Sequence, residues 1–208
     1  MDRKFFTTKG AISEGWRLTK ENLGFLIGYQ LILYFVTLLF SGGKHFGFMH
    51  DLWHLLGTVL IFLLNMGFYK SSLLIATGIK PEFNQLYDNW RQLISWAVAS
   101  FLFAIMFFIG FMLLIVPGCY IWAKYGLFPF FIVDKKAGPI EALKAAGQAT
   151  EGVCATLFGF FVICLLLNIL GFLLLGIGLF FTAPTTLIAM AIIYRKLAYP
   201  VQAPVELV

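Results

Sequence analysis

Long, nearly uninterrupted apolar segments are the feature that most limits how this 208-residue chain can fold. A membrane-spanning helix needs about 20 consecutive apolar residues, and several segments here reach or approach that length. Within hydrocarbon, only helices and closed barrels satisfy the hydrogen bonds of their own backbone. The segments do not alternate between apolar and polar residues as barrel strands do. We therefore expect an all-α fold, a polytopic bundle of membrane helices.

Composition excludes the other broad classes of protein. Hydrophobic residues make up 61% of the chain, charged residues make up 12%, and the mean hydropathy is +0.90. Soluble domains contain about 45–50% apolar and about 25% charged residues. A soluble fold of this length cannot bury so much apolar surface, and a disordered chain would be far more polar. The three cysteines lie in apolar segments without a C-x-x-C pair, so they do not indicate a disulfide framework.

Six membrane spans are predicted within a single integral membrane domain, residues 1–208. Span four is short and contains Lys124 and Pro129, so it is predicted to be kinked or to span only part of the membrane; it follows a Pro117-Gly118 pair that predicts a tight turn. The predicted spans cover residues 23–40, 53–75, 93–116, 119–133, 153–173 and 178–197.

Basic residues indicate the orientation of these spans. Cytoplasmic loops of membrane proteins are rich in Lys and Arg, and the six spans leave 13 of the 15 basic residues on one side. Of the other two, Lys44 lies on the opposite side and Lys124 lies inside span four. We therefore expect both termini in the cytoplasm.

Three segments that precede the odd-numbered spans are predicted to be amphipathic helices in the cytoplasmic membrane interface. They cover residues 11–22, 81–94 and 139–150, and each places apolar and polar side chains on opposite faces. Trp16, Phe83 and Trp90 would contact the interface. The chain then consists of three tandem units of interfacial helix, span and span. The alternative is that ordinary loops between spans are amphipathic without any repeat, and both interpretations stay open.

A distinctive order of short motifs lies between residues 117 and 152, and a second group precedes span one. The motifs are Pro117-Gly118, Tyr125, Phe128-Pro129-Phe130, Val133-Asp134, Gly138-Pro139-Ile140-Glu141-Ala142-Leu143 and Thr150-Glu151-Gly152, with Trp16, Leu18-Thr19-Lys20 and Asn22 before the first span. Together they resemble a family of bacterial integral membrane proteins of uncharacterised function, the YciC-like proteins. The related membrane domain attached to some glycerophosphodiester phosphodiesterases is similar too. The resemblance implies six spans and the bacterial inner (cytoplasmic) membrane. It implies no reaction, because the chain has no soluble phosphodiesterase domain.

Lys124 is the one charged residue well inside a predicted span, where a charge is costly. It follows the Pro117-Gly118 pair closely enough for its side chain to snorkel to the outer interface. The alternative is an anion or substrate contact in a central cavity. Asn65 and Asn168, in spans two and five, are the strongest other polar residues that could line such a cavity. Residues of this kind more often join helices through hydrogen bonds.

The three histidines, His45, His50 and His54, all precede or begin span two. If the start of span two is helical, His50 and His54 share one face and Asp51 lies beside them. Such a set of ligands suits zinc or copper. Histidine is also common at membrane interfaces, so an ordinary interfacial loop is the alternative interpretation.

The sequence lacks the motifs of the common catalytic and nucleotide-binding sites, including the P-loop, HExxH and GxSxG. We expect a non-catalytic protein without a cofactor: a membrane-organising, lipid-interacting or partner-binding module. The alternative is a small transporter or channel with a polar cavity near Lys124, Asn65 and Asn168, and an intramembrane enzyme is the weakest of three hypotheses. Membrane lipids are the expected partners, with other membrane proteins or a second copy of the chain as further candidates. Nucleic acid is not expected, because the basic residues follow the topology of the spans.

Overall fold

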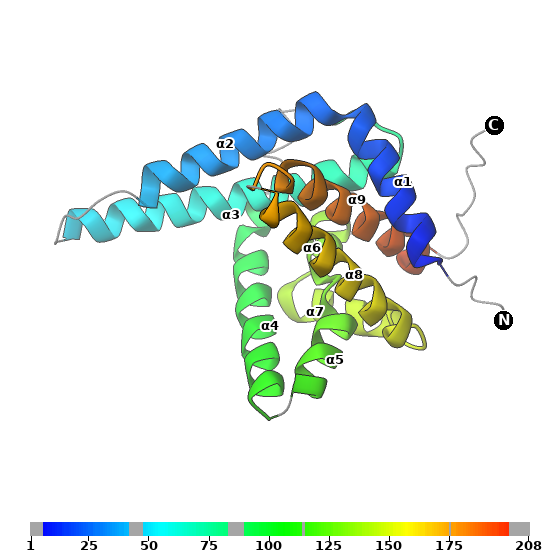
Figure 1. Ribbon diagram of the computed structural model, residues 1–208. Helices are drawn as coiled ribbons and strands as arrows, with labels where there is room; N and C mark the ends of the chain where they lie inside the picture. Colours follow the sequence, from blue (N-terminus) through cyan, green and yellow to red (C-terminus); the bar gives the residue numbers. More distant parts are fainter. Residues whose placement is uncertain (1–5, 42–47, 83–89, 114, 175, 200–208) are drawn as a thin grey trace.

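The computed structural model describes residues 6–41, 48–82, 90–113, 115–174 and 176–199. All regular structure within these residues is helical, which confirms the predicted all-α class (Figure 1). A short 3-10 helix, η2 (Trp90–Gln92), precedes α4. The α-helices are α1 (Thr8–Glu21), α2 (Leu23–Ser41), α3 (Phe48–Ala76), α4 (Leu93–Leu113), α5 (Ile115–Tyr125), α6 (Phe128–Lys135), α7 (Pro139–Ala149), α8 (Cys154–Leu173) and α9 (Leu179–Ala198).

Among the residues that the structure describes, four helical segments combine the length and the apolar composition that crossing a membrane requires. They coincide with predicted spans one, two, three and five. Their bounds are Leu23–Phe40, Asp51–Ala76, Trp90–Leu113 and Cys154–Leu173. The chain therefore has the helices of a membrane protein.

The predicted span four is not a single helix. α5 begins at Ile115, so Pro117 and Gly118 lie in its first turn and not in the tight turn that the pair predicted. Proline is tolerated there because the first amides of a helix have no intrahelical acceptor. The chain leaves the helix after Tyr125, and Pro129 lies in the first turn of α6. With 11 and 8 residues, α5 and α6 are each too short to cross a bilayer alone.

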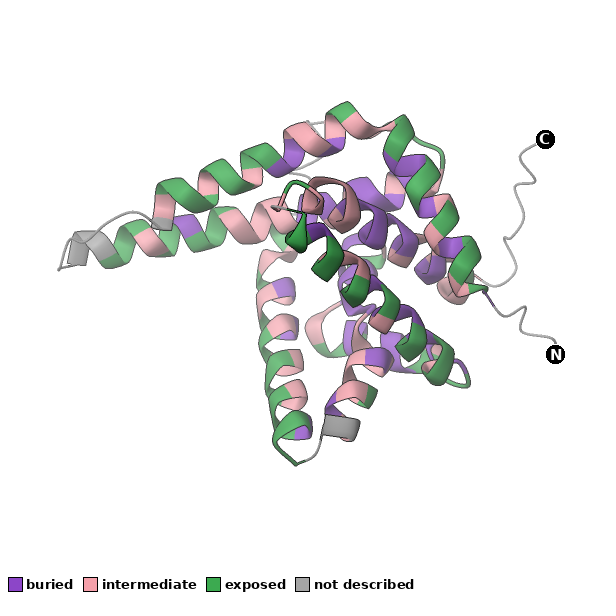
Figure 2. Cartoon of the chain, viewed as in Figure 1, coloured by how far each residue is buried: buried purple, intermediate pink, exposed green. Residues whose placement is uncertain are grey.

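The predicted span six forms a helix, α9, but α9 is not one of the four candidate spans. Residues 184–189 of α9 are buried without interruption, and the helix packs against α1, α3 and α8. Its three threonines and its final Arg195 and Lys196 lower its apolarity. α9 is therefore a central packing helix, surrounded by other helices (Figure 2).

Close backbone approach holds α1 against α9. The buried face of α1 consists of Ala11, Gly15, Leu18 and Thr19. A Cβ atom at Gly15 would lie 2.8 Å from the carbonyl oxygen of Thr185, so only glycine fits at this crossing. Across the same contact, the Thr185 hydroxyl donates a hydrogen bond to the Thr19 hydroxyl at 3.1 Å.

Two helical hairpins, α4–α5 and α8–α9, pack through facing glycines. A Cβ atom at Gly118 of α5 would lie 2.9 Å from the Cα atom of Phe111 in α4. A Cβ atom at Gly178, at the start of α9, would lie 2.6 Å from the Cα atom of Gly171 in α8. Backbones at these distances leave no room for a side chain, so both hairpins depend on glycine at the crossing.

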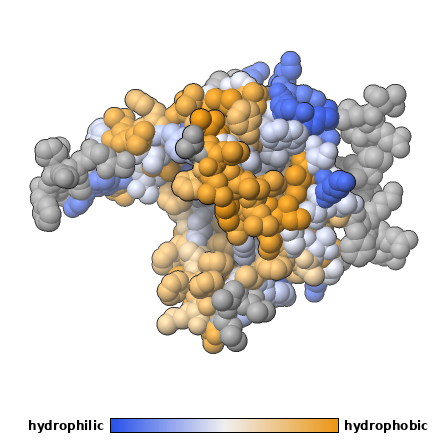
Figure 3. Space-filling model, in the orientation of Figure 1, coloured by the Kyte–Doolittle hydropathy of each residue, from blue (hydrophilic) through white to orange (hydrophobic). Residues whose placement is uncertain are grey.

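The α2–α3 hairpin and the α4–α5 hairpin extend in different directions from the rest of the molecule, and we call them the two arms (Figure 1). Much of each arm is exposed (Figure 2), and its visible surface is largely apolar (Figure 3). The large exposed side chains include Leu31, Ile32, Phe35, Leu38 and Leu39 on α2, and Phe101, Ile105, Phe108, Ile109 and Met112 on α4. This exposure is incompatible with water and suits lipid.

Candidate functional site

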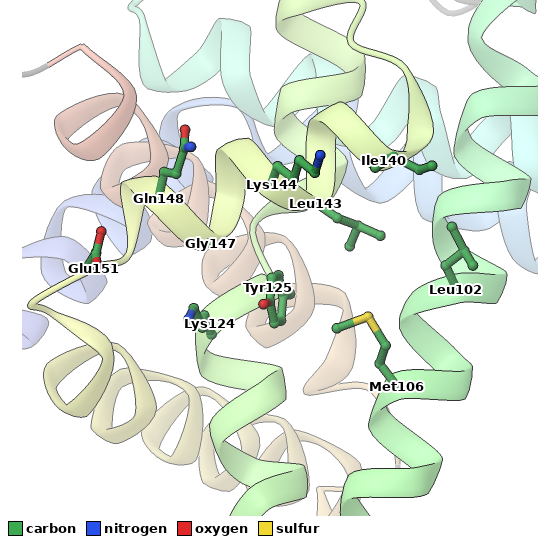
Figure 4. Close-up of a pocket in the computed structure, with 10 residues that line it drawn as sticks. All are labelled: Leu102, Met106, Lys124, Tyr125, Ile140, Leu143, Lys144, Gly147, Gln148 and Glu151. Atoms are coloured by element: carbon green, nitrogen blue, oxygen red, sulfur yellow. The ribbon is translucent and has the colours of Figure 1, made fainter.

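A pocket of about 550 Å³ lies between α4, α5 and α7 and opens to the outside of the molecule (Figure 4). Its size falls within the range of about 300–1,000 Å³ that is typical of ligand sites. The residues that line it are Leu102 and Met106 from α4, Lys124 and Tyr125 from α5, Ile140, Leu143, Lys144, Gly147 and Gln148 from α7, and Glu151 just beyond α7.

α7 approaches the end of α5 closely because of Gly147 and Thr150. A Cβ atom at Gly147 would lie 3.0 Å from a ring carbon of Tyr125 and 3.7 Å from Cε of Lys124, so the missing side chain leaves space for both. The fully buried Thr150 hydroxyl donates a hydrogen bond to the backbone oxygen of Lys124 at 2.8 Å. This contact ties the C-terminal end of α7 to the last turn of α5 and fixes two walls of the pocket.

Lys124 lies in the last turn of α5, beside α7. Its ammonium nitrogen is 5.6 Å from the ring centroid of Tyr120 and 5.8 Å from that of Tyr125, distances at which an aromatic ring attracts a cation. The expectation of snorkelling assumed a turn at Pro117-Gly118. Lys124 lies at the other end of α5 from Pro117 and Gly118 and shares a pocket with Lys144 and Gln148 of the predicted interfacial helix, and its snorkelling stays a prediction.

Asn65 and Asn168 make hydrogen bonds within and between helices. The Asn65 amide donates to the backbone oxygen of Ile61 at 2.8 Å. The Asn168 amide donates to the Cys164 oxygen at 2.8 Å and to the Thr186 hydroxyl at 3.2 Å, and its own oxygen accepts from Thr182. Neither asparagine lines the pocket that contains Lys124. The structure therefore does not place these three predicted residues in that pocket together.

The predicted metal ligands are described only in part. His54 and Asp51 lie in the N-terminal part of α3, and both make contacts of their own. The side chain of His50 and the whole of His45 lie outside the described residues. Within the residues that the structure describes, no three His, Cys, Asp or Glu side chains gather as a metal site would require. A metal site at His50 and His54 stays a prediction.

Two of the three predicted interface residues are described. Trp16 on α1 is 42% exposed, and its ring centroid lies 6.5 Å from that of Phe181 in α9. Trp90 of η2 is 61% exposed, and the Arg91 guanidinium lies 5.6 Å from its ring centroid. Phe83 lies outside the described residues, as does half of the segment 81–94 that was predicted to be an amphipathic helix.

Sequence reasoning missed a polar cluster around Asp134, at the end of α6. The hydroxyls of Tyr194 and Tyr199 both donate to Asp134 Oδ2 at 2.7 Å. The ammonium of Lys135 lies 4.9 Å from the Tyr199 ring, and Arg195 Nη1 donates to the Ala76 oxygen at 3.1 Å. Burial and the bond to Asp134 raise the pKa of Tyr199. The cluster joins the C-terminal ends of α3, α6 and α9, which are far apart in the sequence.

The pocket residues of α7 were also missed, because their partners in the pocket come from other helices. Lys144 and Gln148 lie on the polar face of a predicted interfacial helix, which by itself indicates only a solvated surface. Only the contact between α7 and α5 shows that this face forms the rim of a pocket.

Comparison of the chain with models of protein families, with curated proteins and with solved structures found no match.

Proposed function

We propose that this chain is a non-catalytic integral membrane protein that interacts with lipids and organises them around its two arms. The observation that carries the proposal is the exposure of large apolar side chains along both arms. Helices that expose Leu, Ile and Phe over most of their length are stable only in contact with lipid or with another apolar surface. Because the arms diverge, lipid chains would fill the space between them (Figure 3).

The proposed orientation places the end of the molecule that contains Asp134, Arg195 and α1 in the cytoplasm. Cationic residues from distant segments gather at this end: Arg195 contacts the end of α3, and Lys135 lies against Tyr199. The hydrogen bond from Arg17 lowers the pKa of Glu14 on α1, and the charge of Lys196 at the end of α9 adds a smaller contribution in the same direction. Such a gathering agrees with an excess of positive charge on the cytoplasmic side. Both termini would then lie there, in the inner membrane that the family resemblance implies.

A six-crossing arrangement is part of the proposal, with α5 and α6 together forming one crossing and α9 another. The three units would be α1 to α3, then the segment around η2 with α4 to α6, then α7 to α9. Support comes from the hairpins of the second and third units, which both cross at paired glycines. α1 and α7, which open the first and third units, would lie in the cytoplasmic interface.

Transport is the less favoured function. A transport pathway needs polar groups that face a continuous cavity. Asn65 and Asn168 instead make their described hydrogen bonds to neighbouring helical groups, and the pocket that contains Lys124 is open to one side. These contacts are typical of packing between helices.

The proposal is tested by lipid retention and by solute flux. We expect the chain, purified in mild detergent, to retain several phospholipids through repeated size-exclusion steps, measured as phosphorus per mole of protein. We also expect vesicles that contain the protein to be no more permeable to small ions and sugars than protein-free vesicles. Complete loss of phospholipid would contradict lipid interaction. Solute flux above the protein-free level would instead support the transporter.

A further inference from the structure

The pocket between α4, α5 and α7 has an apolar side and a polar side. Figure 4 shows Leu102, Met106 and Leu143 gathered at one side, while Lys124 and the hydroxyl of Tyr125 lie at the other. A ligand that fits both sides must itself be amphiphilic, with a polar head and an apolar chain. Membrane lipids have this character.

The charges around the pocket favour an anionic head. Lys124 and Lys144 contribute two ammonium groups, and Glu151 contributes one carboxylate. The Lys124 ammonium lies 5.6 Å from the ring centroid of Tyr120 and 5.8 Å from that of Tyr125, so two aromatic rings flank the cation that would meet the head. An ammonium group offers three donors and no acceptor, which suits a phosphate oxygen.

We propose that this pocket binds an anionic phospholipid, with its phosphate at Lys124 and Tyr125 and an acyl chain against Leu102 and Met106. The proposal rests on the lipid interaction proposed above and adds to it the class of lipid and the site. Lys144, at the rim, would contribute to the positive potential around the head.

The dimensions of the pocket suit part of a lipid. About 550 Å³ holds a glycerophosphate head and the first carbons of a chain, and the rest would continue outside. The outside surface next to Leu102 and Met106 is the exposed apolar face of α4, with Phe101, Ile105 and Ile109. A lipid held this way would place its chains along the arm and its head beside α7.

Native mass spectrometry of the full chain in detergent tests the proposal, because it counts bound lipids one by one. The probes are 1-palmitoyl-2-oleoyl phosphatidylglycerol and the phosphatidylcholine with the same chains. We expect the first phosphatidylglycerol to bind at least about tenfold more tightly than phosphatidylcholine. Lys124→Gln should reduce this preference about tenfold, because it removes a positive charge that favours the net negative head of phosphatidylglycerol over the zwitterionic head of phosphatidylcholine, and Lys124→Arg should keep part of the preference.

Matched variants distinguish binding at this pocket from a general electrostatic attraction between the basic protein and anionic lipid. Lys20→Gln removes an ammonium that lies 5.9 Å from the Trp16 ring on α1, and it should leave the preference unchanged. Glu151→Gln should keep or increase phosphatidylglycerol binding. Equal losses in Lys20→Gln and Lys124→Gln would overturn the proposal, because the attraction would then be diffuse.

The remaining outcomes distinguish this inference from the proposed function. If Lys124→Gln binds phosphatidylglycerol as the unmodified chain does, the site is wrong while lipid interaction stands. If both lipids bind equally and Glu151→Gln weakens both, the pocket recognises a zwitterionic head, and the anionic assignment is wrong. If no phospholipid of either class stays bound, the proposed function fails together with the site.

Discussion

Replacing Gly171 by leucine is expected to destabilise the protein by about 3 kcal/mol or more. A Cβ atom at Gly171 would lie 2.5 Å from the Thr182 hydroxyl oxygen and 3.0 Å from the backbone of Gly178. α8 and α9 must therefore separate, and Thr182 must lose its hydrogen bond to Asn168. Overpacking of a tight contact typically costs about 1–3 kcal/mol, and the broken bond adds to it. At about 2–4 °C per kcal/mol, the melting temperature in detergent should fall by roughly 6–12 °C.

Gly159→Leu is the matched control on the same helix. Nothing lies within 4 Å of a Cβ atom at Gly159, which faces outward. The substitution should leave the melting temperature unchanged or raise it slightly, because leucine favours a helix over glycine by somewhat less than about 1 kcal/mol. Equal melting temperatures for Gly171→Leu and Gly159→Leu would show that α8 and α9 do not cross at this point.

Asp134→Ala is expected to reduce stability by about 3 kcal/mol. The carboxylate accepts hydrogen bonds from Tyr194 and Tyr199, and Tyr194 is fully buried. Hydrogen bonds to a charged group contribute about 1.5–3 kcal/mol each, and a buried hydroxyl that loses its acceptor adds a desolvation cost. Loss of this acceptor should loosen the contact between α6 and the end of α9. Thermal unfolding in detergent measures the effect.

Two further variants identify its cause. Asp134→Asn keeps one acceptor oxygen and should lose about half as much stability as Asp134→Ala. The double replacement of Tyr194 and Tyr199 by phenylalanine should make Asp134→Ala cost much less than in the unmodified chain, since the donors are then absent. An undiminished effect of Asp134→Ala in that background would show that the two hydroxyls do not account for it.

The local composition of the chain predicted four of the long helices well. Spans one, two, three and five are continuous apolar segments, and each corresponds to a helix with nearly the predicted bounds. Pro129 indicated a kinked or partly spanning span four, and the structure breaks this segment into α5 and α6 between Tyr125 and Phe128, a position that hydropathy alone does not register. The sequence also did not reveal that α9 is buried, because a span surrounded by protein and a span surrounded by lipid have similar composition.

The candidate site was predicted only in part, because it depends on contacts between distant segments. Lys124 stood out as a charge in an apolar segment, yet its neighbours Lys144 and Gln148 come from α7. α5 begins at Ile115 and ends at Tyr125, so Lys124 lies in its last turn and not near the start of a longer helix. No local sequence pattern indicated the hydrogen bonds of Asp134, since its partners Tyr194 and Tyr199 are about 60 residues away in the chain.

Fluorescence quenching at single cysteines tests the central claim, that the two arms face lipid, most directly. The native Cys119, Cys154 and Cys164 are replaced by alanine, and one cysteine at a time is introduced and labelled. Phe35→Cys on α2 and Phe108→Cys on α4 report on the arms, where the native side chains are 65% and 67% exposed. Ser13→Cys on the exposed polar side of α1, away from the pocket, is the control for water. The protein is reconstituted in vesicles whose phospholipids carry bromine on their acyl chains.

Labels at positions 35 and 108 are expected to be quenched strongly by the brominated chains and hardly at all by iodide in the buffer. The label at position 13 should show the reverse. Strong iodide quenching at both arm positions, with little quenching by the brominated lipid, would contradict a membrane-embedded protein whose arms contact lipid.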